Sequence, residues 1–189
     1  MAHTPVGEIV EARRPRRADA RRNYDALLKA ARETFAEHGA DASLEDIARR
    51  AGVGIGTLYR NFPTRLQLFE VLYADEVDAL CRVADEVADE PPWQALTIWL
   101  RRFVAYMVTK RAIREAVDSE SDVFVSCRAS MYEAGTPLFA RAQDAGAIRP
   151  DMTFDDLIRM VAGVTGASYP TTEQRDRVLE IALDGVRAR

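Results

Sequence analysis

The stretch SLEDIARRAGVGIGTLYRNF, residues 43–62, decides the fold. Two short helices that meet at a steep angle need a small residue where they approach and a residue that tolerates left-handed backbone in the turn. Ala48 and Gly52 meet these two needs, four positions apart. Apolar residues for a shared core recur at the matching offsets: Ile47, Ala51, Val53, Leu58 and Phe62. The stretch therefore predicts a helix-turn-helix.

The segments on either side of this motif also have helical periodicity. Residues 21–38 place five apolar side chains on one helical face: Tyr24, Leu27, Leu28, Ala31 and Phe35. Thr64 and Gln67 form a capping pair that opens a long helix to about residue 87. Further helices are expected near residues 96–107, 122–146, 154–168 and 172–188, with a break at Gly135-Thr136-Pro137. No segment alternates with period two, so we predict an all-α fold of about nine helices.

The composition argues against several classes of protein. Of 189 residues, 48% are hydrophobic and 30% charged, which is typical of a globular chain. No apolar run approaches the roughly 18–20 residues needed to span a bilayer, and the first residues resemble no secretory signal, so we expect a cytoplasmic protein without membrane association. Cys81 and Cys127 are expected to be buried thiols. With only His3 and His38, and without a nucleotide-binding or hydrolase motif, we expect no metal, no cofactor and no enzymatic activity.

Charge is unevenly distributed along the chain. The net charge is −4, yet residues 1–66 carry 12 Lys+Arg against 9 Asp+Glu. Residues 1–20 contain two prolines and the arginines Arg13, Arg14, Arg16 and Arg17, which we interpret as a flexible basic arm. A basic front and an acidic remainder fit a DNA-binding head on a body that stays away from phosphates.

The second helix of the motif carries side chains suited to DNA. Thr57 can donate its hydroxyl to a phosphate, and Tyr59 can reach a phosphate or a thymine methyl group. Arg60 can offer its fork to guanine, and Asn61 suits a phosphate or a base edge. Ser43 and Arg65 would hold the DNA backbone on either side. Plain alternatives stay open: Tyr59 as packing, Arg60 as a solvated charge, and the arm either in the minor groove or as a non-specific tail.

The stretch AGVGIGTLYRNFPTRLQLF, together with ARETFAEHGA before it, resembles the signature of the tetracycline-repressor (TetR) family. The close similarity covers about residues 21–72. It implies DNA contacts from the positions Ser43, Gly54, Ile55, Thr57, Tyr59, Asn61 and Arg65. Positions 54–56 are often polar in the family but are Gly-Ile-Gly here, so base readout is expected to depend more on Arg60, Tyr59 and the arm.

The resemblance implies a helical body with an effector pocket and a two-fold dimer on a palindromic operator. An aromatic-rich set would line the pocket, or else form plain core: Trp99, Phe103, Tyr106, Met107, Phe124, Met131 and Tyr132. The last two helices would form the dimer seam, or else pack within one chain: Leu157, Ile158, Val161, Val164, Ile181 and Val186.

The expected organisation is a basic arm at 1–20, a three-helix DNA-binding domain at 21–66, and an effector-binding and dimerisation domain at 67–189. The expected function is a DNA-binding transcriptional regulator, most simply a ligand-responsive repressor acting as a homodimer with an unknown small-molecule effector. The alternatives are a helical protein-interaction bundle and a DNA-binding protein that responds to no ligand.

Overall fold

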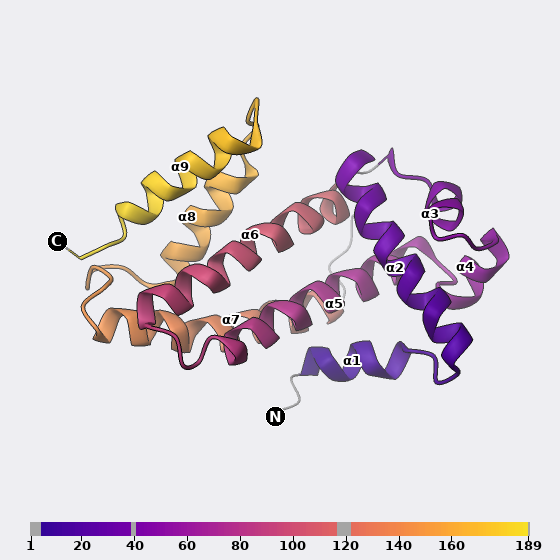
Figure 1. Cartoon of the computed structure of the whole chain (residues 1–189), viewed down its shortest axis with the longest axis horizontal. Coiled ribbons are helices and arrows are strands. Elements are labelled where there is room, and N and C mark those ends of the chain that lie inside the picture. Colours follow the sequence, from indigo (N-terminus) through magenta and orange to yellow (C-terminus); the bar gives the residue numbers. More distant parts are fainter. Residues whose placement is uncertain (1–4, 39–40, 117–121, 189) are drawn as a thin grey trace. The chain divides into compact units, whose positions relative to one another are not determined.

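The computed structural model describes residues 5–38, 41–116 and 122–188. Over these residues the chain forms nine α-helices and no β-strand, with one isolated bridge between Ile148 and Arg187 (Figure 1). The helices are α1 (Pro5–Arg13), α2 (Ala18–His38), α3 (Leu44–Arg50), α4 (Ile55–Asn61), α5 (Arg65–Glu86), α6 (Pro92–Ala116), α7 (Asp122–Asp144), α8 (Phe154–Gly166) and α9 (Thr172–Asp184). The prediction of an all-α fold is confirmed.

The chain divides into two compact units, which are described separately. The first holds the described residues up to Asp78 and those from Thr109 to Ser130, and the second holds the described residues from Ala79 to Val108 and from Met131 onward. The helices α5, α6 and α7 therefore each contribute to both units. The predicted functional boundary at residue 66 stays a prediction.

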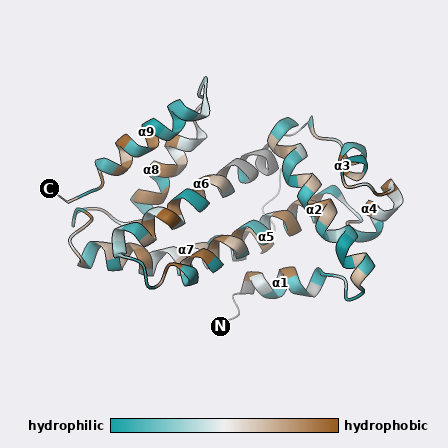
Figure 2. Cartoon of the chain, viewed as in Figure 1, coloured by the Kyte–Doolittle hydropathy of each residue, from teal (hydrophilic) through white to brown (hydrophobic). Residues whose placement is uncertain are grey.

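In the first unit, α2 supports the helix-turn-helix. Its predicted apolar face is buried, including Tyr24 and Phe35. The Phe35 ring lies 4.7 Å from the Phe69 ring of α5, and the Tyr24 ring lies 5.2 Å from that of Phe62 at the end of α4. The helix α3 packs against both α2 and α4. Hydrophobic and hydrophilic residues alternate along these helices, as expected for amphipathic elements (Figure 2).

The helix α1 corrects the prediction of a flexible arm over residues 1–20. Residues 5–13 are helical, whereas residues 1–4 lie outside the described part of the chain. Val6 and Val10, one helical turn apart, are both buried and give α1 an apolar face. Pro5 does not oppose this helix, because a proline in the first turn has no intrahelical N–H bond to lose. The spacing of Val6 and Val10 was the signal in the sequence for this helix.

In the second unit, α8 packs against α9 (Figure 1). Aromatic side chains of α6 form much of the core. Thr153 begins α8 with a capping box, in which its side chain and that of Asp156 each accept a backbone N–H of the other. Thr171 Oγ1 accepts the Gln174 N–H at 3.2 Å and caps α9.

The helix α7 runs without interruption through Gly135-Thr136-Pro137, so the predicted break there is wrong. Pro137 removes one N–H donor from the helix interior, which ordinarily costs about 3 kcal/mol. Buried residues on both sides of this point oppose that cost, namely Met131, Leu138, Phe139 and Ala142. Tertiary packing therefore overrides the local signal.

Candidate nucleic-acid interface

The turn between α3 and α4 has the geometry that the sequence predicted. Ser43 is the N-cap of α3, and its Oγ accepts the backbone N–H of Asp46 at 3.0 Å. Gly52 has a φ of +70°, a conformation that L side chains rarely adopt. Directly after it, the Val53 N–H donates to the Ala48 carbonyl at 3.0 Å and closes the turn. An added Cβ at Gly52 would meet no atom within 4 Å, so backbone conformation and not space requires glycine there.

The core of the motif fixes α4 from beneath. Ile47, Leu58 and Phe62 are at most 1% exposed, and Ala48 is buried where the two helices approach. Truncating a side chain such as Leu58 to alanine typically costs about 2–5 kcal/mol. One face of α4 is therefore anchored, which leaves the opposite face to solvent.

That opposite face holds the residues predicted to contact DNA. Ile55 and Tyr59, one helical turn apart, are 38% and 46% exposed. Arg60 is exposed as well, whereas Thr57 and Asn61 are partly covered. Gly54 and Gly56 are exposed, with nothing within 4 Å of an added Cβ, so the first turn of α4 presents an open surface. Ile55 and Tyr59 thus form the apolar part of this open face.

The polar side chains of α4 bond back along their own helix. Arg60 donates from Nε to the Gly56 carbonyl at 3.2 Å and from Nη2 to Thr57 Oγ1 at 2.9 Å. Asn61 donates from Nδ2 to the Thr57 carbonyl at 2.8 Å. Thr57 therefore accepts hydrogen bonds from both Arg60 and Asn61, a role that the sequence did not indicate.

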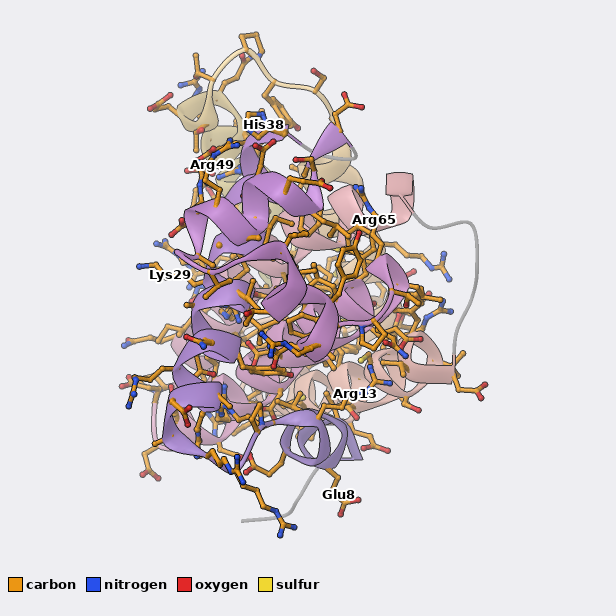
Figure 3. The ribbon with its side chains drawn as sticks, turned by 90° about the vertical axis from the view of Figure 1, so that its right-hand side faces the viewer. Glu8, Arg13, Lys29, His38, Arg49 and Arg65 are labelled. Atoms are coloured by element: carbon orange, nitrogen blue, oxygen red, sulfur yellow. The ribbon has the colours of Figure 1, made fainter. Side chains whose placement is uncertain are left out.

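The two residues predicted to flank the DNA are placed differently. The hydrogen bond with Ser43 holds the pKa of the Asp46 carboxyl below its usual range, and the charge of Arg49 adds to this effect. The guanidinium of Arg65, which is labelled in Figure 3, lies over the rings of Phe35 and Phe69, at 5.9 and 5.3 Å from their centroids. These two aromatic faces orient Arg65 at the start of α5.

The four arginines near the N-terminus do not act as one group. Arg13 pairs with Glu70 of α5 at 3.3 Å, and Arg14 pairs with Asp25 of α2 at 2.7 Å. Arg16 and Arg17 are exposed between α1 and α2. Carboxylates on neighbouring helices therefore hold Arg13 and Arg14, which were expected to be part of a flexible basic arm.

A hollow of about 330 Å³ lies between the end of α2 and α3, and the sequence did not predict it. It is lined by Thr34, His38, Asp46, Arg49 and Arg50. Arg49 pairs with Asp46, and Arg50 pairs with Glu37. The positive charges of Arg49 and Arg50 in this hollow are therefore already compensated by carboxylates of the protein.

The structure brings together only part of the predicted effector-binding set. Trp99, Phe103 and Tyr106 are buried on α6, with Trp99 and Phe103 stacked at 5.8 Å and Phe103 and Tyr106 at 5.7 Å. In the same unit Met131 is buried, while Met107 and Tyr132 are half-buried. Phe124 belongs to the first unit, where its ring meets that of Tyr73 edge-on at 4.9 Å.

Phe154 belongs to this aromatic cluster and Gly135 makes room for it, and neither role was predicted from the sequence. The Phe154 ring lies 5.9 Å from that of Trp99 and 5.4 Å from that of Tyr132. Gly135 allows this approach, since an added Cβ would lie 2.4 Å from Phe154 Cζ and 2.6 Å from Trp99 Cη2. The Trp99 Nε1–H is buried without a hydrogen-bond partner among the described residues. A glycine in the middle of an amphipathic pattern was the available signal.

The residues predicted for a dimer seam differ in exposure. Leu157, Ile158, Val161 and Val186 are all at most 7% exposed within a single chain. Val164 is partly exposed, and Ile181 on α9 is 66% exposed. The buried members are therefore core residues of their own unit, and Val164 and Ile181 are the ones that a second chain would reach.

Two general features bear on the chemistry of the described residues. No group of three or more His, Cys, Asp or Glu side chains is gathered in a way that would hold a metal ion. None of the helices is both long and apolar enough to cross a membrane.

Comparison with known protein families gives two matches. Residues 27–72 match the family described as bacterial regulatory proteins, tetR family. Residues 91–188 match the family described as transcriptional regulator SbtR-like, C-terminal domain.

Individual relatives point the same way. The crystal structure of a TetR transcriptional regulator from Streptomyces coelicolor is 42% identical with a TM-score of 0.71, covering 87% of this chain and 98% of its own. A TetR transcription regulatory protein from Mycobacterium vanbaalenii is 33% identical with a TM-score of 0.66, covering 92% and 100%. An HTH-type transcriptional regulator of Staphylococcus aureus is 34% identical over 84 residues, which are 42% of this chain and 44% of that protein. The match to this curated relative thus spans less than half of its length.

Proposed function

The chain belongs to the TetR family of bacterial transcriptional regulators, and from this premise we propose that it is a sequence-specific regulator that binds a palindromic DNA operator as a dimer. We propose further that it acts as a repressor and that a small-molecule effector releases it from DNA. The DNA-binding part of this proposal rests on one observation. The helix α4 is anchored by a buried core and presents Ile55, Tyr59 and Arg60 on its open face.

The proposed contacts follow from this placement. Tyr59 and Ile55 offer apolar contact to thymine methyl groups, and the bare backbone at Gly54 allows a close approach to DNA. Thr57, Asn61, Ser43 and Arg65 would contact phosphates or base edges around this face. Arg16 and Arg17 are the arginines available for an adjacent groove.

Effector binding is proposed for the aromatic cluster of the second unit. A buried donor without a partner is unusual in proteins, so the Trp99 Nε1–H supports a ligand that carries a hydrogen-bond acceptor. The surrounding rings of Phe103 and Phe154 favour an apolar or aromatic ligand body. Trp99 fluorescence in a Trp93→Phe variant would report such a ligand during a compound screen.

DNA binding is tested by selecting bound duplexes from a random pool and titrating the enriched site by fluorescence anisotropy. Affinity for the selected site should fall steeply with salt, and Tyr59→Ala should weaken binding at least tenfold. Lys29→Ala, an exposed change on α2, is the control. Failure to enrich any duplex, or a Tyr59→Ala protein that binds like the wild type, would contradict the proposal.

Dimerisation is tested by light scattering. We propose that Ile181→Lys converts a dimer into a monomer, because it places a charge in the apolar seam. Val125→Lys is a matched control, since Val125 is 57% exposed on α7. A wild-type monomer at micromolar concentration would exclude this seam.

A further inference from the structure

We propose that Arg60 determines the base preference of α4 by reading a guanine with the outer edge of its guanidinium, and that Thr57 is the residue that positions it. This inference rests on the proposed DNA-binding function and names what the recognition helix reads. It concerns two side chains, one of which acts through the other.

The contacts of Arg60 leave one edge of its guanidinium free. The side edge, formed by Nε–H and one Nη2–H, is occupied by the Gly56 carbonyl and by Thr57 Oγ1. A guanidinium carries five N–H donors in a fixed planar fork, so two are used and three remain. The outer edge presents one N–H from each terminal nitrogen, side by side. Guanine offers O6 and N7 as paired acceptors in the major groove, which match this edge.

The charge of Arg60 is also available. Its side chain is exposed, and no carboxylate in the described part of the chain pairs with it. By contrast, Arg13, Arg14, Arg32 and Arg50 in the same unit are all paired with carboxylates. On α4 itself, the cation of Arg60 is therefore free of a carboxylate partner among the described residues and available to DNA.

Apart from Tyr59, which offers apolar contact to thymine methyl groups, the rest of α4 offers few competitors for base readout. Gly54 and Gly56 carry no side chain, and Ile55 can supply only apolar contact. The amide of Asn61 is held by the Thr57 carbonyl at 2.8 Å. Arg60 folds back toward the start of its helix, as long helical side chains do, and so brings its donors over this bare turn.

Thr57 orients the guanidinium of Arg60 through its hydroxyl group. A free arginine side chain loses much rotational freedom when it binds a base, and holding it in advance lowers that cost. The Thr57 hydroxyl supplies the one side-chain contact that fixes the plane of the guanidinium. Thr57→Val keeps the shape of the residue and removes this acceptor, whereas Thr57→Ser retains it.

The experiment measures base preference at each half-site position, using full-length wild type and the variants Arg60→Ala, Thr57→Val, Thr57→Ser and Lys29→Ala. Random duplex pools are selected with each protein, and the affinity ratio of guanine to adenine is then measured at the position that wild type fixes as guanine. Circular dichroism confirms that every variant is folded.

We expect wild type to prefer guanine by roughly tenfold or more, and Arg60→Ala to lose most of this preference. Thr57→Val should lower the preference several-fold, Thr57→Ser should restore it, and Lys29→Ala should leave the ratio unchanged. In the Arg60→Ala background, Thr57→Val should change the ratio no further, because Thr57 acts through Arg60.

Three results would count against the inference in different ways. If wild type selects no duplex, the proposed function itself fails. If Arg60→Ala keeps the guanine preference of a protein that does bind DNA, the function stands and the role of Arg60 is overturned. If Thr57→Val weakens binding equally at all sequences, Thr57 acts only as a phosphate contact and does not position Arg60.

Discussion

Replacing Gly135 by alanine should destabilise the protein, although the same change in a helix is ordinarily favourable. Gly135 lies in the interior of α7. Alanine is about 1 kcal/mol better than glycine at such positions when nothing opposes it. Here an added Cβ would lie 2.4 Å from Phe154 Cζ, and 2.6 and 2.8 Å from two atoms of the Trp99 ring. Unstrained carbon atoms keep about 3.5–4.0 Å apart.

Neither ring has room to retreat easily. Trp99 is fully buried and stacked on Phe103, and Phe154 is 7% exposed with Tyr132 and Phe139 around it. Overpacking of this kind typically costs 1–3 kcal/mol, of which the helix preference offsets up to about 1 kcal/mol. We therefore expect a net loss of up to about 2 kcal/mol, which lowers Tm by up to roughly 8 °C in a chain of this size.

Urea and thermal unfolding followed by circular dichroism measure this loss. Gly56→Ala is the control, because it is also a helical glycine and nothing lies within 4 Å of its added Cβ. Phe154→Leu removes the ring atom nearest to the new methyl group, so the double variant should lose less than the sum of the single changes. A Gly135→Ala protein as stable as the Gly56→Ala protein would refute the steric argument.

Three further changes follow from the contacts of the first unit. Tyr24→Phe should leave stability unchanged or raised in urea unfolding, because the buried hydroxyl has no partner among the described residues; a loss above about 1 kcal/mol would contradict this. Burial raises the pKa of Tyr24 to about 12, so above pH 10 the folded state keeps a proton that the unfolded state releases. The free energy of unfolding of the wild type should therefore fall between about pH 10 and 12. That of the Tyr24→Phe protein should fall less over the same range. Arg13→Ala should weaken the attachment of α1 by about 1 kcal/mol, because it leaves Glu70 without its cation. Amide exchange in residues 5–13 should then be faster. Unchanged protection would show that the buried Val6 and Val10 are sufficient to hold α1. Ser43→Ala should cost about 0.5–2 kcal/mol through loss of the α3 cap, with Thr64→Ala as a comparison at the start of α5.

The sequence by itself determined the scaffold of the DNA-binding motif. Ala48, Gly52, Leu58 and Phe62 follow from local rules on helix approach, left-handed backbone and periodicity, and such rules act over a few residues. The capping residues Ser43 and Thr171 were predictable for the same reason. The face of α4 was also predictable, because a buried Leu58 forces its helical neighbours outward.

Only the tertiary structure decided which side chains are free and which are held. Arg13 and Arg14 looked like Arg16 and Arg17 in the sequence, yet their carboxylate partners lie 57 and 11 residues away. Helix α7 continues through Pro137, and Gly135 is required beneath Trp99 and Phe154, because of contacts among residues far apart in the chain. Pairing of charges and packing of rings depend on such distant contacts, which a local pattern does not encode.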